Sequence, residues 1–146
     1  MTTLTVWKFN SAEGAEEALT KLTQLQREHI IEIKDAATVS WAEGKKKPKT
    51  KQAINLAGLG ALDGAFWGLL FGILFFAPVL GVAVGSVSGA IPGHFTEFGV
   101  SKNFLKQIED TVRPGTSALA IIASNVTVDK AVQALNPLHP EVIRSS

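Results

Sequence analysis

The segment "GLGALDGAFWGLLFGILFFAPVLGVAVGSVSGAIPG", residues 58–93, carries glycines at a fixed spacing through the most apolar part of the chain. In a helix, residues four apart lie nearly above one another, so glycines at this spacing predict a groove without side chains along one helix face. The spacing occurs in two runs, one on each side of Pro78: Gly60, Gly64, Gly68 and Gly72, then Gly81, Gly85, Gly89 and Gly93.

Such a pattern destabilises isolated helices, and some other interaction must offset that effect. A glycine inside a helix costs about 1 kcal/mol relative to alanine, so eight cost about 8 kcal/mol, which is comparable to the stability of a small domain. Close approach of another helix offsets this cost through dispersion and weak Cα–H···O contacts, as in the small-xxx-small pattern of membrane helices. We therefore expect residues 53–99 to form an apolar glycine-zipper helical hairpin.

The setting of this hairpin is expected to be a membrane. Asp63 is the only charged residue between positions 53 and 93. A bilayer span needs about 20 apolar residues; the arm 53–77 is long enough, whereas the arm 79–93 is short, at about 22 Å. Because the turn "FFAPVLG" holds no charged or amide side chain, we expect the tip to end inside hydrocarbon or inside an oligomer core. A hairpin buried within a soluble protein is the alternative.

The segments on either side of the hairpin predict a small α+β domain. Alternating apolar residues predict strands at 4–9, 30–43 (bent near Asp35), 45–52, 116–124 and 141–145, and helical periodicity predicts helices at 10–29, 101–112 and 127–135. The order matches a ferredoxin-like βαββαβ domain, an antiparallel sheet with the first two helices on one face, followed by a small helix and a tail. The expected parts are 1–52, the inserted hairpin 53–99, and 100–146.

Polar residues at the element boundaries complete this prediction. Asn10 or Ser11 is expected to cap the first helix, Ser101 the second and Thr127 the last, because their side chains can accept from the free N–H groups of a first helical turn. Pro48 is expected to restrict the third strand to an edge of the sheet, since proline cannot donate to a neighbouring strand.

Length and composition exclude several classes of protein. The chain has 146 residues, a length that suits one domain. Its net charge of +1 says little about binding partners. It contains no cysteine, so disulfides and thiolate chemistry are excluded. The start "MTTLTVWKFN" lacks the basic and apolar regions of a signal peptide, so we expect the first segment to stay in the cytoplasm.

Three stretches resemble a known family: "GAFWGLLFGILFFAPVLGVAVGSVSGAIPG" (64–93), "FGVSKNFLKQI" (98–108) and "RPGTSALAIIAS" (113–124). Together they resemble the bacterial membrane proteins grouped as domain of unknown function 1269. The resemblance implies a small α/β domain that carries a glycine-zipper segment. We expect a bacterial inner-membrane location with the α/β domain on the cytoplasmic side, because lysines lie before and after the hairpin, as the positive-inside bias predicts. The resemblance supplies no catalytic residues, because the activity of that family is not established.

A few residues could carry chemistry. Asp63, as an acid inside an apolar segment, is expected to line an ion path or to fix the register of packed helices. His94 and Glu97 are three residues apart and could share one face of a helix. Two ligands do not complete a metal site, so we expect no metal and no cofactor. No histidine is placed to activate Ser86 or Ser88 as a nucleophile.

Lysines and tryptophans suggest surfaces and packing. Five lysines precede the hairpin and could contact lipid headgroups, or could simply lie in a solvated turn: Lys45, Lys46, Lys47, Lys49 and Lys51. No nucleic-acid motif accompanies them, so a nucleic-acid partner is not expected. Trp67 lies near the middle of the first arm, away from the membrane interface that tryptophan prefers, which favours packing against protein.

The expected function is that of a membrane-associated homo-oligomer assembled through glycine-lined helices, as a pore or a membrane-organising ring. The alternative is a soluble homo-oligomeric shell or scaffold with the apolar hairpins packed inside and enclosing lipid. A regulatory module that binds a small ligand is a third class. We do not expect an enzyme, because no acid–base pair or nucleophile constellation is present.

Overall fold

The computed structural model describes residues 2–46, 48–52, 67, 70–71 and 102–144. Within them the element order is β1 (Thr2–Phe9), α1 (Gly14–Arg27), β2 (Ile33–Ser40), β3 (Lys49–Gln52), α5 (Lys102–Thr111), β4 (Ser117–Ser124), α6 (Asn125–Leu135), a 3-10 turn (Asn136–Leu138) and β5 (Glu141–Arg144). The predicted mixture of helices and strands is confirmed. The predicted hairpin lies outside the described residues, apart from Trp67, Leu70 and Phe71, which are helical.

The strands form one antiparallel sheet in the order β3-β2-β4-β1-β5. The apolar stretch "SALAIIAS" of β4 lies in the centre, paired with β1 along its whole length and with β2 on the other side. A strand that is apolar throughout suits this central position, where both of its faces are covered. The predicted edge position of β3 is confirmed, β5 forms the other edge, and Pro48 directly precedes β3.

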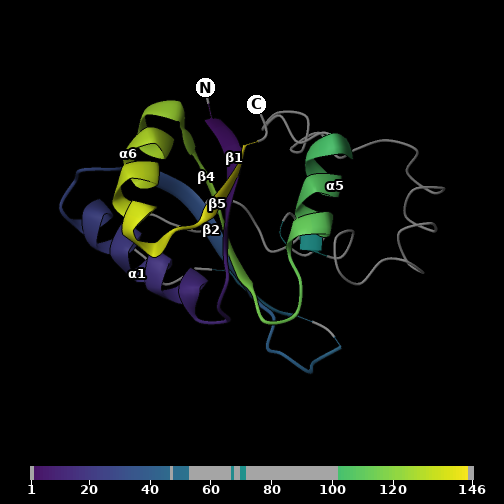
Figure 1. Ribbon diagram of the computed structural model, residues 1–146. Coiled ribbons are helices and arrows are strands. Elements are labelled where there is room, and N and C mark those ends of the chain that lie inside the picture. The colour runs from purple at the N-terminus through teal and green to yellow at the C-terminus, as the bar shows by residue number, and fades with distance from the viewer. Residues whose placement is uncertain (1, 47, 53–66, 68–69, 72–101, 145–146) are drawn as a thin grey trace.

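Helices cover both faces of the sheet. Figure 1 shows α1 and α6 on one face and α5 on the other, and the core divides in the same way. Trp7 and Leu119 face α1 and α6, whereas Val6 and Ala120 face α5. Both faces need a cover because every residue of β4 from Ser117 to Ala123 is buried, in a strand that is apolar on either side.

The predicted placement of the helix at 101–112 is wrong. We expected it beside the first helix, yet Phe104 and Ile108 of α5 pack on the opposite face of the sheet. The helix that lies beside α1 is α6, the element expected to be an addition after the domain. Helical periodicity identified the apolar side of each helix but could not say which of two apolar sheet faces it would cover.

The predicted bend in the second strand is confirmed. The pairing of β2 with β4 shifts register between Ile33 and Asp35, so one extra residue is accommodated there. Ile33 pairs with Ala123, and Asp35 pairs with Ile122. Since opposite residues in an antiparallel pair share a face, the bulge turns Asp35 toward the α5 side.

The start of α1 differs from the prediction. Neither Asn10 nor Ser11 caps the helix; Glu13 precedes its first residue and its side chain makes no capping bond. The Oγ of Ser117, at the start of β4, instead accepts from the Ala15 N–H at 2.9 Å and donates to the Ser11 carbonyl at 2.7 Å. The cap is therefore supplied by a residue distant in the sequence.

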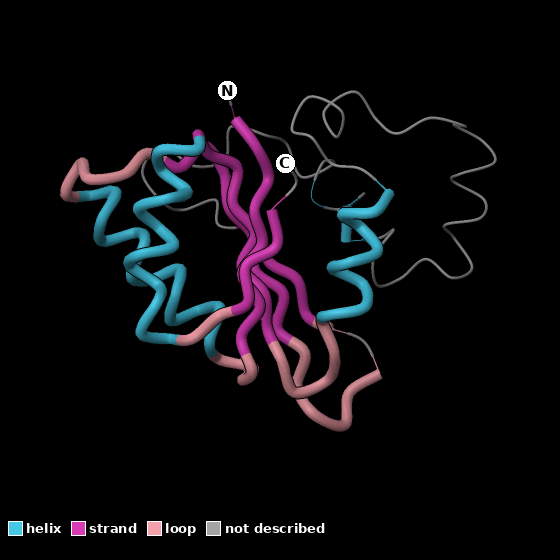
Figure 2. Tube along the Cα trace, turned by 45° about the horizontal axis from the view of Figure 1, so that its top comes forward, coloured by secondary structure: helices cyan, strands magenta, loops and turns pink. Residues whose placement is uncertain are grey.

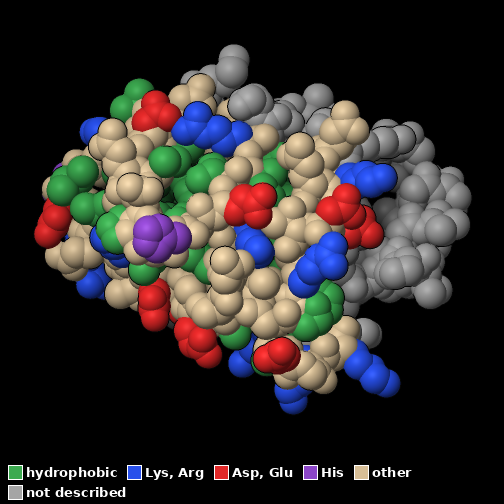
Figure 3. Space-filling model, viewed as in Figure 1, with side chains coloured by type: hydrophobic (Ala, Val, Ile, Leu, Met, Phe, Trp, Pro, Cys, Tyr) green, Lys and Arg blue, Asp and Glu red, His purple; other side chains and the backbone are tan. Residues whose placement is uncertain are grey.

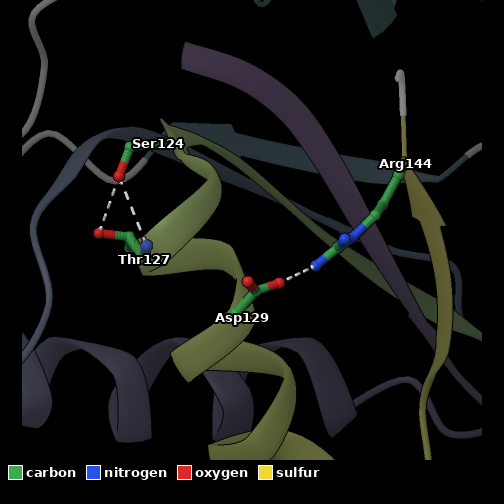
Figure 4. A network of polar contacts seen from close by, with 4 residues as sticks. All are labelled: Ser124, Thr127, Asp129 and Arg144. Atoms are coloured by element: carbon green, nitrogen blue, oxygen red, sulfur yellow. Dashed lines mark hydrogen bonds and ion pairs between the residues drawn. The ribbon is translucent and has the colours of Figure 1, made fainter. Parts of the chain in front are cut away.

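The start of α6 lies earlier than predicted. Ser124 is the cap, and its Oγ accepts from the Thr127 N–H at 3.4 Å (Figure 4). Thr127, the expected cap, lies inside the first turn, where its Oγ1 accepts from the Glu32 N–H at 3.3 Å. Ser101, the expected cap of α5, lies outside the described residues.

Candidate functional site

Most of the predicted site residues lie outside the described part of the chain. This holds for the eight glycines of the two runs, for Asp63 and Lys47, and for Ser86, Ser88, His94 and Glu97. Their roles stay predictions. The described residues place two features of the predicted site: the contact of the apolar segment with the sheet, and the lysines before it.

The apolar segment contacts the sheet through Trp67, Leu70 and Phe71. Their side chains are 2%, 1% and 5% exposed and belong to the core cluster on the α5 face of the sheet. The rings of Trp67 and Phe71 stack with centroids 5.9 Å apart and an interplanar angle of 25°. The expectation that Trp67 packs against protein is confirmed.

This contact is tightly packed and leaves no room for a ligand. A cavity of about 10 Å³ lies beneath Leu70 and Phe71, against Ile108 of α5. Its lining is apolar, and its volume is close to the minimum that one water needs. Val6, Val39 and the alanines at positions 118 and 120 of the sheet complete the lining. We therefore regard this face as a packing surface.

Asp35 is a buried acid, at a position where the sequence predicts only a bend in the strand. Its side chain is 0% exposed on the α5 side of the sheet, and its Oδ1 accepts from the Ala36 N–H at 2.8 Å. Carboxylates are almost never fully buried without partners. The hydrogen bond from the Ala36 N–H is therefore part of what allows the carboxylate to lie inside the protein. The available signal was weak, because Asp35 follows the exposed Lys34 and only the residues after it, from Ala36, are small or apolar.

Four of the five predicted headgroup contacts are exposed: Lys45, Lys46, Lys49 and Lys51. The turn that carries the first two is fixed by Trp41, whose Nε1 donates to the Lys45 carbonyl at 2.9 Å. Trp41 also bonds to the chain before β4, through Thr116 and Gly115. None of the four lysines takes part in an ion pair within the described residues.

This lysine turn marks one end of the sheet. Phe9, Ser117, Ser40 and Lys49 form one row across the four strands β1, β4, β2 and β3, and the turn follows Ser40. Figure 3 shows Lys and Arg side chains at the lower end of the molecule, with acidic side chains beside them. The surface there is charged but not exclusively basic.

A family model described as "Protein of unknown function (DUF1269)" matches residues 61–146, more than half of the chain. The chain belongs to this family. The match confirms the resemblance found in the sequence, and it includes the described elements α5, β4, α6 and β5. No curated protein and no solved structure matches the chain.

Within the region that matches DUF1269, an exposed ion pair joins β5 to α6. Arg144 Nη2 of β5 lies 2.7 Å from Asp129 Oδ1 of α6 (Figure 4), and the two side chains are 43% and 68% exposed. Exposed pairs of this kind contribute at most about 1 kcal/mol. The pair joins the edge strand to the helix above it.

Three further findings concern the described residues of this DUF1269 protein. They contain no group of three or more His, Cys, Asp or Glu side chains that could hold a metal ion. None of their helices has both the length and the apolar character that crossing a bilayer requires. His29 and His139 are exposed, and both have a left-handed backbone conformation.

Proposed function

We propose that this DUF1269 protein is a membrane-associated homo-oligomer that assembles through the glycine-lined segment 53–99. The observation that supports this proposal is that both faces of the sheet are already covered. One face is covered by α1 and α6, and the other by α5 together with Trp67, Leu70 and Phe71. The many other apolar residues of the segment need partners elsewhere, and lipid and the same segment of other copies supply them.

The fold that we propose for the α/β domain is ferredoxin-like. Its six elements would be β1, α1, β2, β4, α6 and β5, with β3, the apolar segment and α5 inserted between β2 and β4. Two observations support it: the order β2-β4-β1-β5 within the sheet and the position of α1 and α6 on one face. This assignment replaces the one expected from sequence, in which β3 and the helix at 101–112 belonged to the repeat.

In the proposed assembly, the glycines and Asp63 of the segment have the roles predicted from the sequence. The glycine faces would form the seam between helices, and Asp63 would line an ion path or fix the register of the seam. A pore and a membrane-organising ring are the two forms of such an assembly. The proposed location is a bacterial inner membrane, with the α/β domain on the cytoplasmic side.

A soluble scaffold is the second candidate, and one observation favours it. Trp67, Leu70 and Phe71 lie in the arm 53–77, and they are buried against the sheet of the α/β domain. Residues that contact this sheet cannot at the same time contact lipid. An arm docked in this way suits a particle in which apolar segments pack inside.

Extraction of membranes at alkaline pH separates the two candidates. The proposal predicts that the full chain stays in the membrane pellet and needs detergent for release, because its apolar segment contacts lipid. A peripheral protein of known behaviour serves as the control and must be released. A monodisperse particle obtained without detergent would contradict membrane association and favour the scaffold.

A further inference from the structure

We infer that one end of the α/β domain rests on the lipid bilayer, with Ile30 and Val126 inserted among the headgroups. This inference rests on the proposed membrane association and adds the orientation of the domain. Among the described residues, the large apolar side chains classed as exposed are Ile30 at 45%, Val126 at 66% and Val142 at 37%. The first two lie at one end of the sheet, whereas Val142 lies on the edge strand β5.

A rigid turn presents Ile30. At the end of α1, the His29 N–H donates to the Gln26 carbonyl and the Ile30 N–H donates to the Leu25 carbonyl, each at 3.0 Å. With His29 in the left-handed conformation, at φ 62°, these bonds form the six-residue closure common at helix ends. The apolar residue at Ile30's position usually packs back on its helix, but here nearly half of it stays exposed.

Val126 lies on the first turn of α6, which is bonded to the turn that carries Ile30. The Lys130 Nζ donates to the Ile30 carbonyl at 3.2 Å, and the Glu32 N–H donates to Thr127 Oγ1 at 3.3 Å. Val126 and Lys130 are one helical turn apart and therefore share a side of α6. The two exposed apolar side chains thus lie on two bonded elements, the α1–β2 turn and the start of α6, and we call them together the patch.

The position of α5 indicates that the partner is lipid. Figures 1 and 2 show that α5 begins at the same end of the sheet at which α6 begins. The described chain resumes there, at Lys102, after the apolar segment. A bilayer that accommodates this segment therefore lies next to the end that exposes Ile30 and Val126.

Charge does not explain the contact. Exposed cations and anions are balanced around the patch: Arg27, Lys34 and Lys130 against Glu28, Glu32 and Asp129. Insertion of apolar side chains would therefore dominate, with little dependence on anionic lipid or on salt. The turn with Lys45 and Lys46 lies at the opposite end of the sheet, so one flat bilayer cannot contact both surfaces.

Single labels test the orientation, because the chain contains no cysteine of its own. The variants Ile30→Cys and Val126→Cys, each with an environment-sensitive fluorophore, are reconstituted as full chains in phosphatidylcholine vesicles. Val142→Cys and Lys45→Cys are the matched controls. We expect a blue shift of emission, and quenching by nitroxide lipids, at positions 30 and 126 and not at 142 or 45.

Three results would contradict this picture in different ways. Quenching at position 45 but not at 30 or 126 would overturn the inference and support headgroup contacts of the lysine turn. A blue shift at 30 and 126 that appears in lipid-free detergent and grows with protein concentration would overturn it by identifying a second copy as the partner. Failure of the unaltered chain to float with vesicles would overturn the proposed function itself.

Discussion

Ser117 shows how a single residue takes its role from tertiary structure. In the sequence it opens an apolar strand, and the local pattern places the cap of the first helix at Asn10 or Ser11. In the fold, its buried hydroxyl bonds to Ala15, 102 positions away. The sequence signals for a helix cap come from residues next to the helix. They therefore could not identify a capping residue that belongs to a distant strand.

Replacement of Ser117 tests this cap. Ser117→Ala leaves the Ala15 N–H and the Ser11 carbonyl without their buried partner, which we expect to lower the free energy of unfolding by about 1–3 kcal/mol. Denaturant unfolding followed by tryptophan fluorescence measures the change. Ser11→Ala is the matched control and should change it by less than about 0.5 kcal/mol. A larger loss for Ser11→Ala than for Ser117→Ala would contradict the assignment.

At Gly14, the packing predicts the opposite effect of an alanine substitution from the one that helix propensity predicts. Gly14 is the first residue of α1, and a Cβ there would lie 2.5 Å from the Cβ of Phe9. Propensity favours alanine by about 1 kcal/mol, but this overlap should cost more, so Gly14→Ala is expected to destabilise by about 1–3 kcal/mol. Glu17→Ala, at an exposed position of the same helix, is the control. A raised denaturation midpoint for Gly14→Ala would show that Phe9 moves aside easily.

At the scale of elements, the sequence predicted most strands and helices but not their faces. The central position of β4, the edge positions of β3 and β5, and the bend of β2 follow from apolar pattern and from Pro48. The face covered by α5 does not follow, because β4 offers apolar side chains in both directions. The handedness of each strand–helix–strand connection decides the face, and it is not readable from the apolar pattern of a helix.

The start of α6 provides a test at this scale. Ser124→Ala removes the side-chain acceptor of the Thr127 N–H, which we expect to destabilise the domain by about 1 kcal/mol. Asn125→Ala, at the next and exposed position, should leave stability nearly unchanged. Hydrogen exchange of the first-turn amides of α6 measures the effect locally: faster exchange is expected for Ser124→Ala alone. Equal exchange in both variants would refute the cap.

At the scale of the whole molecule, coverage of both sheet faces links the fold to the proposed function. Periodic glycines and the apolar composition of 53–99 could be recognised in the sequence. The position of Trp67 in the arm predicted packing against protein, but not that the partner is the sheet. The burial of Leu70 and Phe71 could not be predicted, because these residues look like the rest of the segment. Asp35 was also missed, since burial of an acid depends on the bulge that turns it inward.

The docking contact can be tested through Trp67. Trp67→Ala removes a side chain that is 2% exposed, and we expect a loss of about 3–5 kcal/mol, as for other buried tryptophans. Val126→Ala, at an exposed apolar position, is the control and should change stability little. Denaturant unfolding monitored by far-UV circular dichroism provides the measurement. A Trp67→Ala protein as stable as the unaltered chain would show that the segment does not stabilise the sheet.

The central claim is that glycine-lined faces hold several copies together in a membrane. Native mass spectrometry from lipid nanodiscs tests it most directly, on the unaltered chain, on Gly64→Leu and Gly85→Leu, and on the off-groove controls Phe66→Leu and Val87→Leu. We expect one defined oligomer with bound lipid for the unaltered chain and the controls, and monomers for the two glycine variants, because leucine fills the groove between the helices. An unaltered stoichiometry in both glycine variants, or a monomeric unaltered chain, would contradict it.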